Sequence, residues 1–287
     1  MANTATKTRK PVKRSAAKAA PEPMNIDWVE LMEKALTVPG SLGNQFNRFY
    51  NYSFFNMIWL MVQGVNEPVA TYRRWGTLGR QVRKGSKGKT VLHPVIVTKR
   101  DPETKKPILD KNGKQQRIVI GFQARPTVFA LSDTDGPDLE LPEIPDWDLE
   151  LAMKTLGITR VEFATADGNT GGYSTGSEIA INPVNDAPMH TAFHELGHVV
   201  LGHTKPEGVK EYQTHRGSME FEAESVAYLV SHELELTEKG WDASASRAYI
   251  QGWLKGKDVT DAQIKAVFSA TNKILVAGRP KKDDDSE

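Results

Sequence analysis

Cysteine is absent from the 287 residues, and so is any run of eighteen apolar residues. The first absence excludes disulfides, thiolate metal ligands and a cysteine nucleophile, and it is typical of a reducing compartment. The second excludes a transmembrane helix. The first twenty residues hold six Lys or Arg and no apolar stretch, so they do not resemble a secretory signal. We therefore expect a cytoplasmic protein with no membrane partner.

Charge is abundant but segregated, although the net charge is only +1. Residues 71–100 carry nine Lys or Arg and no acid, whereas residues 133–150 carry eight Asp or Glu and no base. Three prolines interrupt the acidic stretch, which is typical of a linker. We predict disordered tails, two domains and a linker: a basic tail at 1–24, a first domain at 25–132, a linker at 133–147, a second domain at 148–278 and a tail at 279–287.

The first domain is predicted to be a small α+β domain. Residues 27–37 fit an amphipathic helix with Asp27 as its N-cap, and the apolar stretch after Ser53 fits a buried helix. The β-branched runs at 90–97 and 117–122 fit two strands joined by a hairpin loop.

The basic segment of this domain is a candidate nucleic-acid surface. Cationic side chains neutralise phosphates, and aromatic side chains give unpaired bases a surface to stack on. The alternative is a solvated face whose aromatics belong to the core. The candidate DNA-binding residues are Tyr72, Arg73, Arg74, Trp75, Arg80, Arg83, Lys84, Lys87 and Lys89.

Residues 194–198 read His-Glu-Leu-Gly-His within an apolar stretch, and they are the most chemically specific feature of the chain. On a helix, His194 and His198 project from one face, as two ligands of one metal ion must. Glu195 lies between them, where its carboxylate can take a proton from a metal-bound water. The expected ion is one Zn²⁺, with another divalent metal as the alternative.

A second helix is predicted at 218–234, where Glu220 and Glu224 lie four residues apart on one face. One carboxylate would bind the metal and the other would orient a ligand histidine. The spacing leaves Glu220, Glu224 and Glu222 open as the third ligand. His203 and His215 are weaker candidates, and we expect them to have structural roles.

The Glu-x-x-Ala-Glu arrangement resembles the second helix of gluzincin metallopeptidases, which implies Glu220 as third ligand and Glu224 as the residue behind a histidine. More widely, the chain resembles ArdC-type antirestriction proteins of plasmids and phages. The stretches that carry this resemblance are NYSFFNMIWLMVQ, WGTLGRQVRKGSKG, TVFALSDTDG, GGYSTGSEIAIN, HTAFHELGHVVLGH and MEFEAE.

The resemblance implies an α+β fold with a single-stranded-DNA-binding domain followed by a zincin-like metallopeptidase domain. It implies strands at 161–165 and 176–182. The second strand would border a substrate cleft, and an extended peptide could pair with its edge. Tyr173 would lie near that cleft as a candidate oxyanion donor. The implied partners are single-stranded DNA and a protein substrate. The implied activity is protection of incoming DNA, with a DNA-localised protease and a non-catalytic structural zincin as alternatives.

Overall fold

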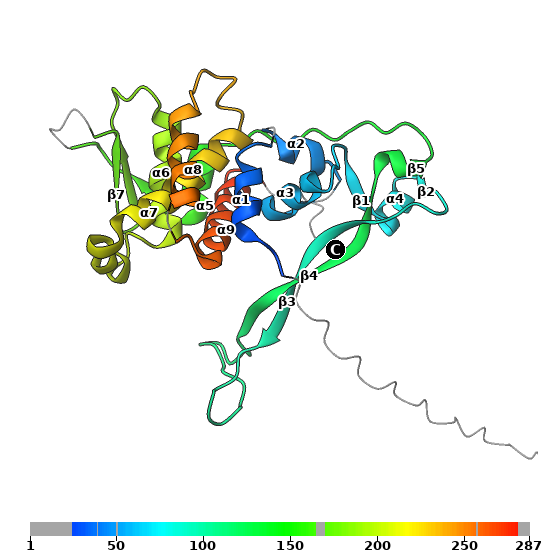
Figure 1. Ribbon diagram of the computed structural model, residues 1–287, viewed down its shortest axis with the longest axis horizontal. Helices are drawn as coiled ribbons and strands as arrows, with labels where there is room; N and C mark the ends of the chain where they lie inside the picture. The colour runs from blue at the N-terminus through cyan, green and yellow to red at the C-terminus, as the bar shows by residue number, and fades with distance from the viewer. Residues whose placement is uncertain (1–24, 39, 50, 165–169, 257, 281–287) are drawn as a thin grey trace, which may run out of the picture. The chain divides into compact units, whose positions relative to one another are not determined.

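Helices and strands both occur along the chain, in the computed structural model shown in Figure 1, which confirms the α+β class. The structure describes residues 25–38, 40–49, 51–164, 170–256 and 258–280. The predicted tail at 1–24 and most of the predicted tail at 279–287 lie outside these residues. None of the described helices is long and apolar enough to cross a membrane.

The first helices begin at the polar residues that the sequence indicates. The Asp27 carboxylate accepts a hydrogen bond from the Glu30 N–H at 2.9 Å and caps α1 (Trp28–Ala35). The Ser53 hydroxyl accepts one from the Asn56 N–H at 3.3 Å and caps α3 (Phe54–Val62), which is mostly buried. Both caps satisfy N–H groups that have no partner inside the helix. The short α2 (Leu42–Phe46) lies between these helices in the chain.

A three-stranded sheet has the order β1-β4-β3. It contains β1 (Val69–Thr71), β3 (Lys89–Thr98) and β4 (Arg117–Ala130). Both predicted strands are confirmed, and β4 runs on to Ala130 because its last residues pair antiparallel with β1. The helix α4 (Tyr72–Thr77) follows β1, and β2 (Gln81–Val82) pairs with β5 (Thr134–Asp135), which follows the 3-10 turn Leu131–Asp133.

A second sheet has the order β6-β8-β7, after α5 (Leu149–Leu156). Its strands are β6 (Thr159–Arg160), β7 (Gly172–Thr175) and β8 (Glu178–Ile181). The prediction of a strand at 176–182 is confirmed. The strand expected at 161–165 lies instead at 159–160, and residue 165 is outside the described residues. Gly157 ends α5 in the left-handed region at φ 70°, so the chain enters the sheet two residues later, at Thr159.

Four helices complete the chain: α6 (Pro188–Leu201), α7 (Pro206–Glu233), α8 (Ser244–Gly256) and α9 (Asp261–Ala277). The predicted helix at 218–234 is the second half of α7. The helix begins earlier, at Pro206, because proline suits a first helical position. His215 has non-helical angles (φ −122°, ψ 22°), so α7 consists of two helical stretches.

The described residues form two compact units. One comprises residues 94–123, and the other comprises residues 25–93 and 124–280. Within the larger unit, Trp28 of α1 stacks on Phe55 of α3 at 4.8 Å, and Phe55 packs against Phe268 of α9 at 5.9 Å. The early helices therefore share a core with the last helix. The domain boundary at 133–147 stays a prediction.

Candidate metal centre

The helix α6 places the two histidines of the His-Glu-Leu-Gly-His motif side by side. Pro188 occupies its first turn, and Gly202 ends it in the left-handed region at φ 88°. The Nε2 atoms of His194 and His198 lie 3.1 Å apart. His198 and Glu195 are buried, at 5% and 7% exposure. One helical turn thus brings two imidazole nitrogens to one point.

The helix α7 adds a carboxylate at that point. Glu220 Oε2 lies 3.3 Å from His194 Nε2 and 3.8 Å from His198 Nε2. One ligand atom from each of the three residues lies within 4.8 Å of the others. Gly197 permits this approach, because a Cβ there would lie 3.3 Å from Ala223 Cα on α7. Of the three open carboxylates, Glu220 is the one that joins both histidines.

Glu224 lies behind His194, with Oε2 2.9 Å from its Nδ1. The other oxygen lies 3.2 Å from His190 Nε2, and His190 Nδ1 lies 3.0 Å from the Ser231 hydroxyl. His190 also stacks on Trp241 at 4.5 Å. His190 is not among the residues predicted from the sequence, although its place four residues before His194 puts it on the same helix face.

His203 and Glu222 form a second supporting chain behind His198. His203 Nδ1 lies 3.0 Å from His198 Nδ1, and His203 Nε2 lies 2.9 Å from Glu222 Oε2. His203 is buried, at 7% exposure. A structural role was expected for His203. Its side chain instead lies between the candidate ligand His198 and the carboxylate of Glu222. His215 is exposed in the middle of α7 and does not join this group.

Negative charge dominates around the two imidazoles. Burial alone would lower the pKa of His194, but hydrogen bonds with Glu220 and Glu224 raise that pKa to about 10. Burial would raise the pKa of Glu224, but its hydrogen bonds to His190 and His194 lower it well below its usual range. The group therefore attracts a cation, either a proton or a metal ion.

The donor set fits a divalent metal ion. Two imidazole nitrogens and one carboxylate oxygen converge, which is the ligand type that suits zinc and similar ions. The other ring nitrogen of each histidine already has a partner, as is usual for metal-ligating histidines. His194, His198 and Glu220 together form a candidate metal site.

The edge strand β7 lies against Glu195. A Cβ on Gly172 would lie 3.3 Å from Glu195 Cγ, so the side-chain direction of this residue faces α6. Successive residues of a strand point to opposite faces, so Tyr173 points away. Its hydroxyl donates to the Glu162 carbonyl at 3.4 Å, and its ring packs against Phe163 at 5.7 Å. This geometry does not support the predicted oxyanion role of Tyr173.

Trp75 belongs to the core, which corrects its prediction as a DNA-binding residue. It is fully buried, and its Nε1 donates to the Phe129 carbonyl at 2.9 Å. Its ring packs edge-on against Phe49 at 5.4 Å. A side chain without exposed surface cannot stack on a base, so the core alternative holds for this residue.

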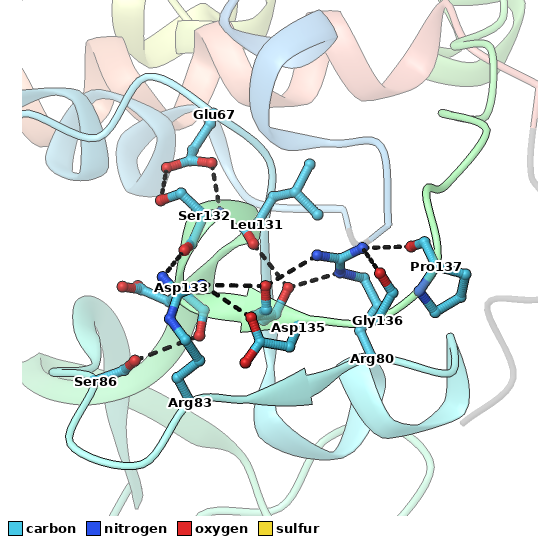
Figure 2. Close-up of polar contacts among 11 residues, drawn as sticks. Glu67, Arg80, Arg83, Ser86, Leu131, Ser132, Asp133, Asp135, Gly136 and Pro137 are labelled. Atoms are coloured by element: carbon cyan, nitrogen blue, oxygen red, sulfur yellow. Dashed lines mark hydrogen bonds and ion pairs between the residues drawn. The ribbon is translucent and has the colours of Figure 1, made fainter.

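Three of the candidate DNA-binding cations form hydrogen bonds or ion pairs with other residues of the protein, as Figure 2 shows for the two arginines. Arg80 donates to the Thr134 hydroxyl at 2.7 Å and to the Gly136 carbonyl at 3.1 Å. Arg83 pairs with Asp135 at 3.2 Å and donates to the Ser132 carbonyl. Lys89 lies 3.8 Å from Asp133. The basic segment therefore pairs with the start of the acidic segment, which was predicted to be a separate linker.

The remaining candidates lie at the surface. Tyr72 is 59% exposed, and its ring meets Phe129 edge-on at 6.4 Å. The other exposed members of the predicted set are Arg73, Arg74, Lys84 and Lys87.

This is a mixed helix and sheet protein with a candidate metal centre between two helices. Residues 7–129 match the family model described as the N-terminal domain of anti-restriction factor ArdC. This match assigns residues 7–129 to the ArdC N-terminal domain family. Two solved structures of the antirestriction ArdC protein from the R388 plasmid resemble it, one metal-free and one Mn(II)-bound. They are 19% and 18% identical with TM-scores of 0.48 and 0.46, and the similarity covers 88% of this chain and 95% and 96% of theirs.

Two proteins of Escherichia coli, both described as DNA primase TraC, are also similar to this chain. Each is 30% identical, over 247 and 228 residues, or 78% and 71% of this chain. The chain spans only 22% and 15% of the length of these relatives.

Proposed function

We propose that this chain is an antirestriction-type protein that binds single-stranded DNA and carries a zinc-dependent hydrolase site, and that it protects incoming plasmid or phage DNA. The observation that carries the hydrolase part is the convergence of His194, His198 and Glu220 within 4.8 Å, next to the buried Glu195. The match of residues 7–129 to the N-terminal domain of ArdC supports the antirestriction part.

In the proposed site, His194, His198 and Glu220 would hold the ion, and Glu224 and His203 would orient the two imidazoles. A bound Zn²⁺ supplies Lewis-acid activation of water and of a substrate carbonyl. Glu195 takes the proton of the attacking water and transfers it to the leaving amine. Burial of Glu195 keeps bulk water away from this carboxylate, which strengthens its electrostatic interactions.

A peptide is the proposed substrate of this site. The strand β7 is an edge of its sheet and lies against Glu195. An extended peptide can pair with the N–H and C=O groups of such an edge and be held beside the carboxylate. This observation favours the second candidate function, a protease that DNA binding brings to a protein such as a restriction subunit or a repressor.

The variant Glu195→Gln tests the hydrolase proposal. It should retain the metal, because Glu195 is not among the proposed ligands, and it should lose hydrolysis of an unfolded protein substrate by at least about 100-fold. Metal content by elemental analysis and cleavage by gel assay are the measurements, with the exposed Glu178→Gln as control. If Glu195→Gln protects DNA against restriction as well as the wild type does, hydrolysis is not the protective act.

Single-stranded DNA is the proposed nucleic-acid partner of the exposed part of the basic segment. Lys84 and Lys87 are exposed, whereas Arg80 and Arg83 are engaged by their own chain. The double variant Lys84→Gln with Lys87→Gln should therefore weaken binding without loss of the fold. The slope of the logarithm of the binding constant against the logarithm of the salt concentration, here called the salt slope, should be shallower by about 1.4. Each phosphate contact with a single strand contributes about 0.7 to this slope.

Fluorescence anisotropy of a labelled oligonucleotide in a salt series measures this slope. The exposed lysines Lys154 and Lys239 give a matched control, as the variant Lys154→Gln with Lys239→Gln. Equal slopes for the two double variants would refute the assignment of the surface to Lys84 and Lys87.

A further inference from the structure

The hairpin of residues 94–123 exposes aliphatic side chains on both of its faces; we call these residues the 94–123 hairpin. Ile118, Val119 and Ile120 follow one another on β4 and are 41%, 54% and 56% exposed. Because successive side chains of a strand alternate, these three cover both faces. A two-stranded hairpin without a covered face is only marginally stable in water, so a partner would stabilise it.

The same hairpin is strongly basic. It holds seven Lys or Arg and three Asp or Glu, a net charge of +4 within a protein whose total is +1. Two of its acids hold turns: Asp101 accepts from the Thr104 N–H at 2.7 Å, and Asp110 accepts from the Asn112 N–H at 2.8 Å. Among the described residues, none of the seven cations forms an ion pair with a carboxylate; they are Lys99, Arg100, Lys105, Lys106, Lys111, Lys114 and Arg117.

Charge selects the kind of partner. Two copies of this hairpin would repel each other, whereas a polyanion would neutralise it and release counterions. The hairpin contains one aromatic residue, Phe122, so it offers little surface for stacking unpaired bases. A two-stranded ribbon does fit the major groove of B-DNA, which is about 12 Å wide, and aliphatic side chains there contact thymine methyl groups.

We infer that the 94–123 hairpin binds the groove of duplex DNA, with its lysines on phosphates and its exposed aliphatic side chains against base pairs. The inference rests on the proposed DNA binding and extends it, because the protein then holds duplex DNA as well as a single strand. A duplex with a single-stranded tail would therefore contact both the 94–123 hairpin and the surface with Lys84 and Lys87.

The test is a triple variant that removes charge from the hairpin only: Lys106→Gln, Lys111→Gln and Lys114→Gln. All three side chains are exposed. Anisotropy with a labelled blunt duplex should show a salt slope shallower by up to about 2.7, at about 0.9 per lost phosphate contact. Affinity for a single strand of the same sequence should change less than twofold. The matched control removes three exposed lysines from elsewhere: Lys154→Gln, Lys239→Gln and Lys273→Gln.

A second variant, Ile118→Thr with Ile120→Thr, separates apolar contact from charge. Threonine keeps the β-branched shape that favours a strand. This variant should weaken duplex binding several-fold and leave the salt slope unchanged. Circular dichroism of each variant shows whether the fold persists.

The possible outcomes separate the inference from the proposed function. If the wild type binds neither form of DNA, the proposed function itself fails. If it binds single strands but not duplex, or if the triple variant and its control bind duplex with equal slopes, the inference about the hairpin is overturned and single-strand binding stands. If light scattering shows that the hairpin variants dissociate a dimer of the wild type, the hairpin contacts a second copy instead.

Discussion

The buried carboxylate Glu233 at the end of α7 leads to a quantitative prediction about pH. Its two oxygens accept hydrogen bonds from the Leu42 N–H at 2.8 Å and the Gly43 N–H at 2.6 Å, at the start of α2. The side chain is only 4% exposed. Burial raises the pKa of Glu233 from 4.5 to about 7, although the two backbone hydrogen bonds and the charge of Arg279 act in the opposite direction.

A raised pKa means that the folded protein binds this proton more tightly than the unfolded chain does. The resulting stabilisation is therefore complete below pH 4.5 and is lost as pH rises through 7. Between pH 5 and pH 8 the loss amounts to about 2 to 3 kcal/mol, at about 1.36 kcal/mol for each unit of pKa shift. Glutamine has the shape of the neutral carboxyl and does not ionise, so Glu233→Gln lacks this loss.

From pH 5 to pH 8, we expect the unfolding free energy of the wild type to fall relative to that of Glu233→Gln by about 2 to 3 kcal/mol. Urea unfolding followed by circular dichroism, with EDTA present to remove metal, measures it at both pH values. The exposed Glu238→Gln is the control and should show no such shift. A difference that is the same at pH 5 and pH 8 would mean that Glu233 is ionised at both, and the burial argument would be refuted.

Three further results are expected. Gly40→Ala should lower the unfolding free energy by about 1–3 kcal/mol in urea, because its Cβ would lie 2.4 Å from the backbone oxygen of His232; an unchanged value would contradict this close approach. His203→Ala should weaken metal affinity about 10- to 100-fold in calorimetry, because it removes the partner of His198. The control His215→Ala changes an exposed histidine and should leave the affinity unchanged. Equal affinities for the two variants would exclude the supporting role of His203. Excess Zn²⁺ should raise the melting temperature, and chelation should reverse the rise; a metal-independent melting temperature would contradict the proposed site.

Local signals were enough to locate some of the helices and strands. Asp27 and Ser53 cap the helices that they were expected to cap, and the β-branched runs are strands. These predictions succeed because a cap bonds within one turn and a strand pattern repeats every two residues. The strand expected at 161–165 lies at 159–160, directly after Gly157 ends the preceding helix. The helix α7 is longer than expected because it continues past the irregular His215.

The candidate DNA surface was less predictable than the helices and strands. Composition could not separate the buried Trp75 from the exposed Tyr72, since both lie on the short helix α4 and only one faces the core. Nor could it show that Arg80 and Arg83 bind the backbone and side chains of residues 132–137. Such contacts join residues about fifty positions apart, so no local pattern reports them.

The spacing of His194, Glu195 and His198 along the chain is sufficient to put two imidazoles on one helix face, because an α-helix repeats every 3.6 residues. The choice of Glu220 to meet both of them depends on how α6 packs against α7 at Gly197. The same packing brings Glu224 to His194 and joins His203 to Glu222. Local periodicity thus specifies the motif, and only the packing of two helices, which residue spacing does not encode, completes the candidate metal site around it.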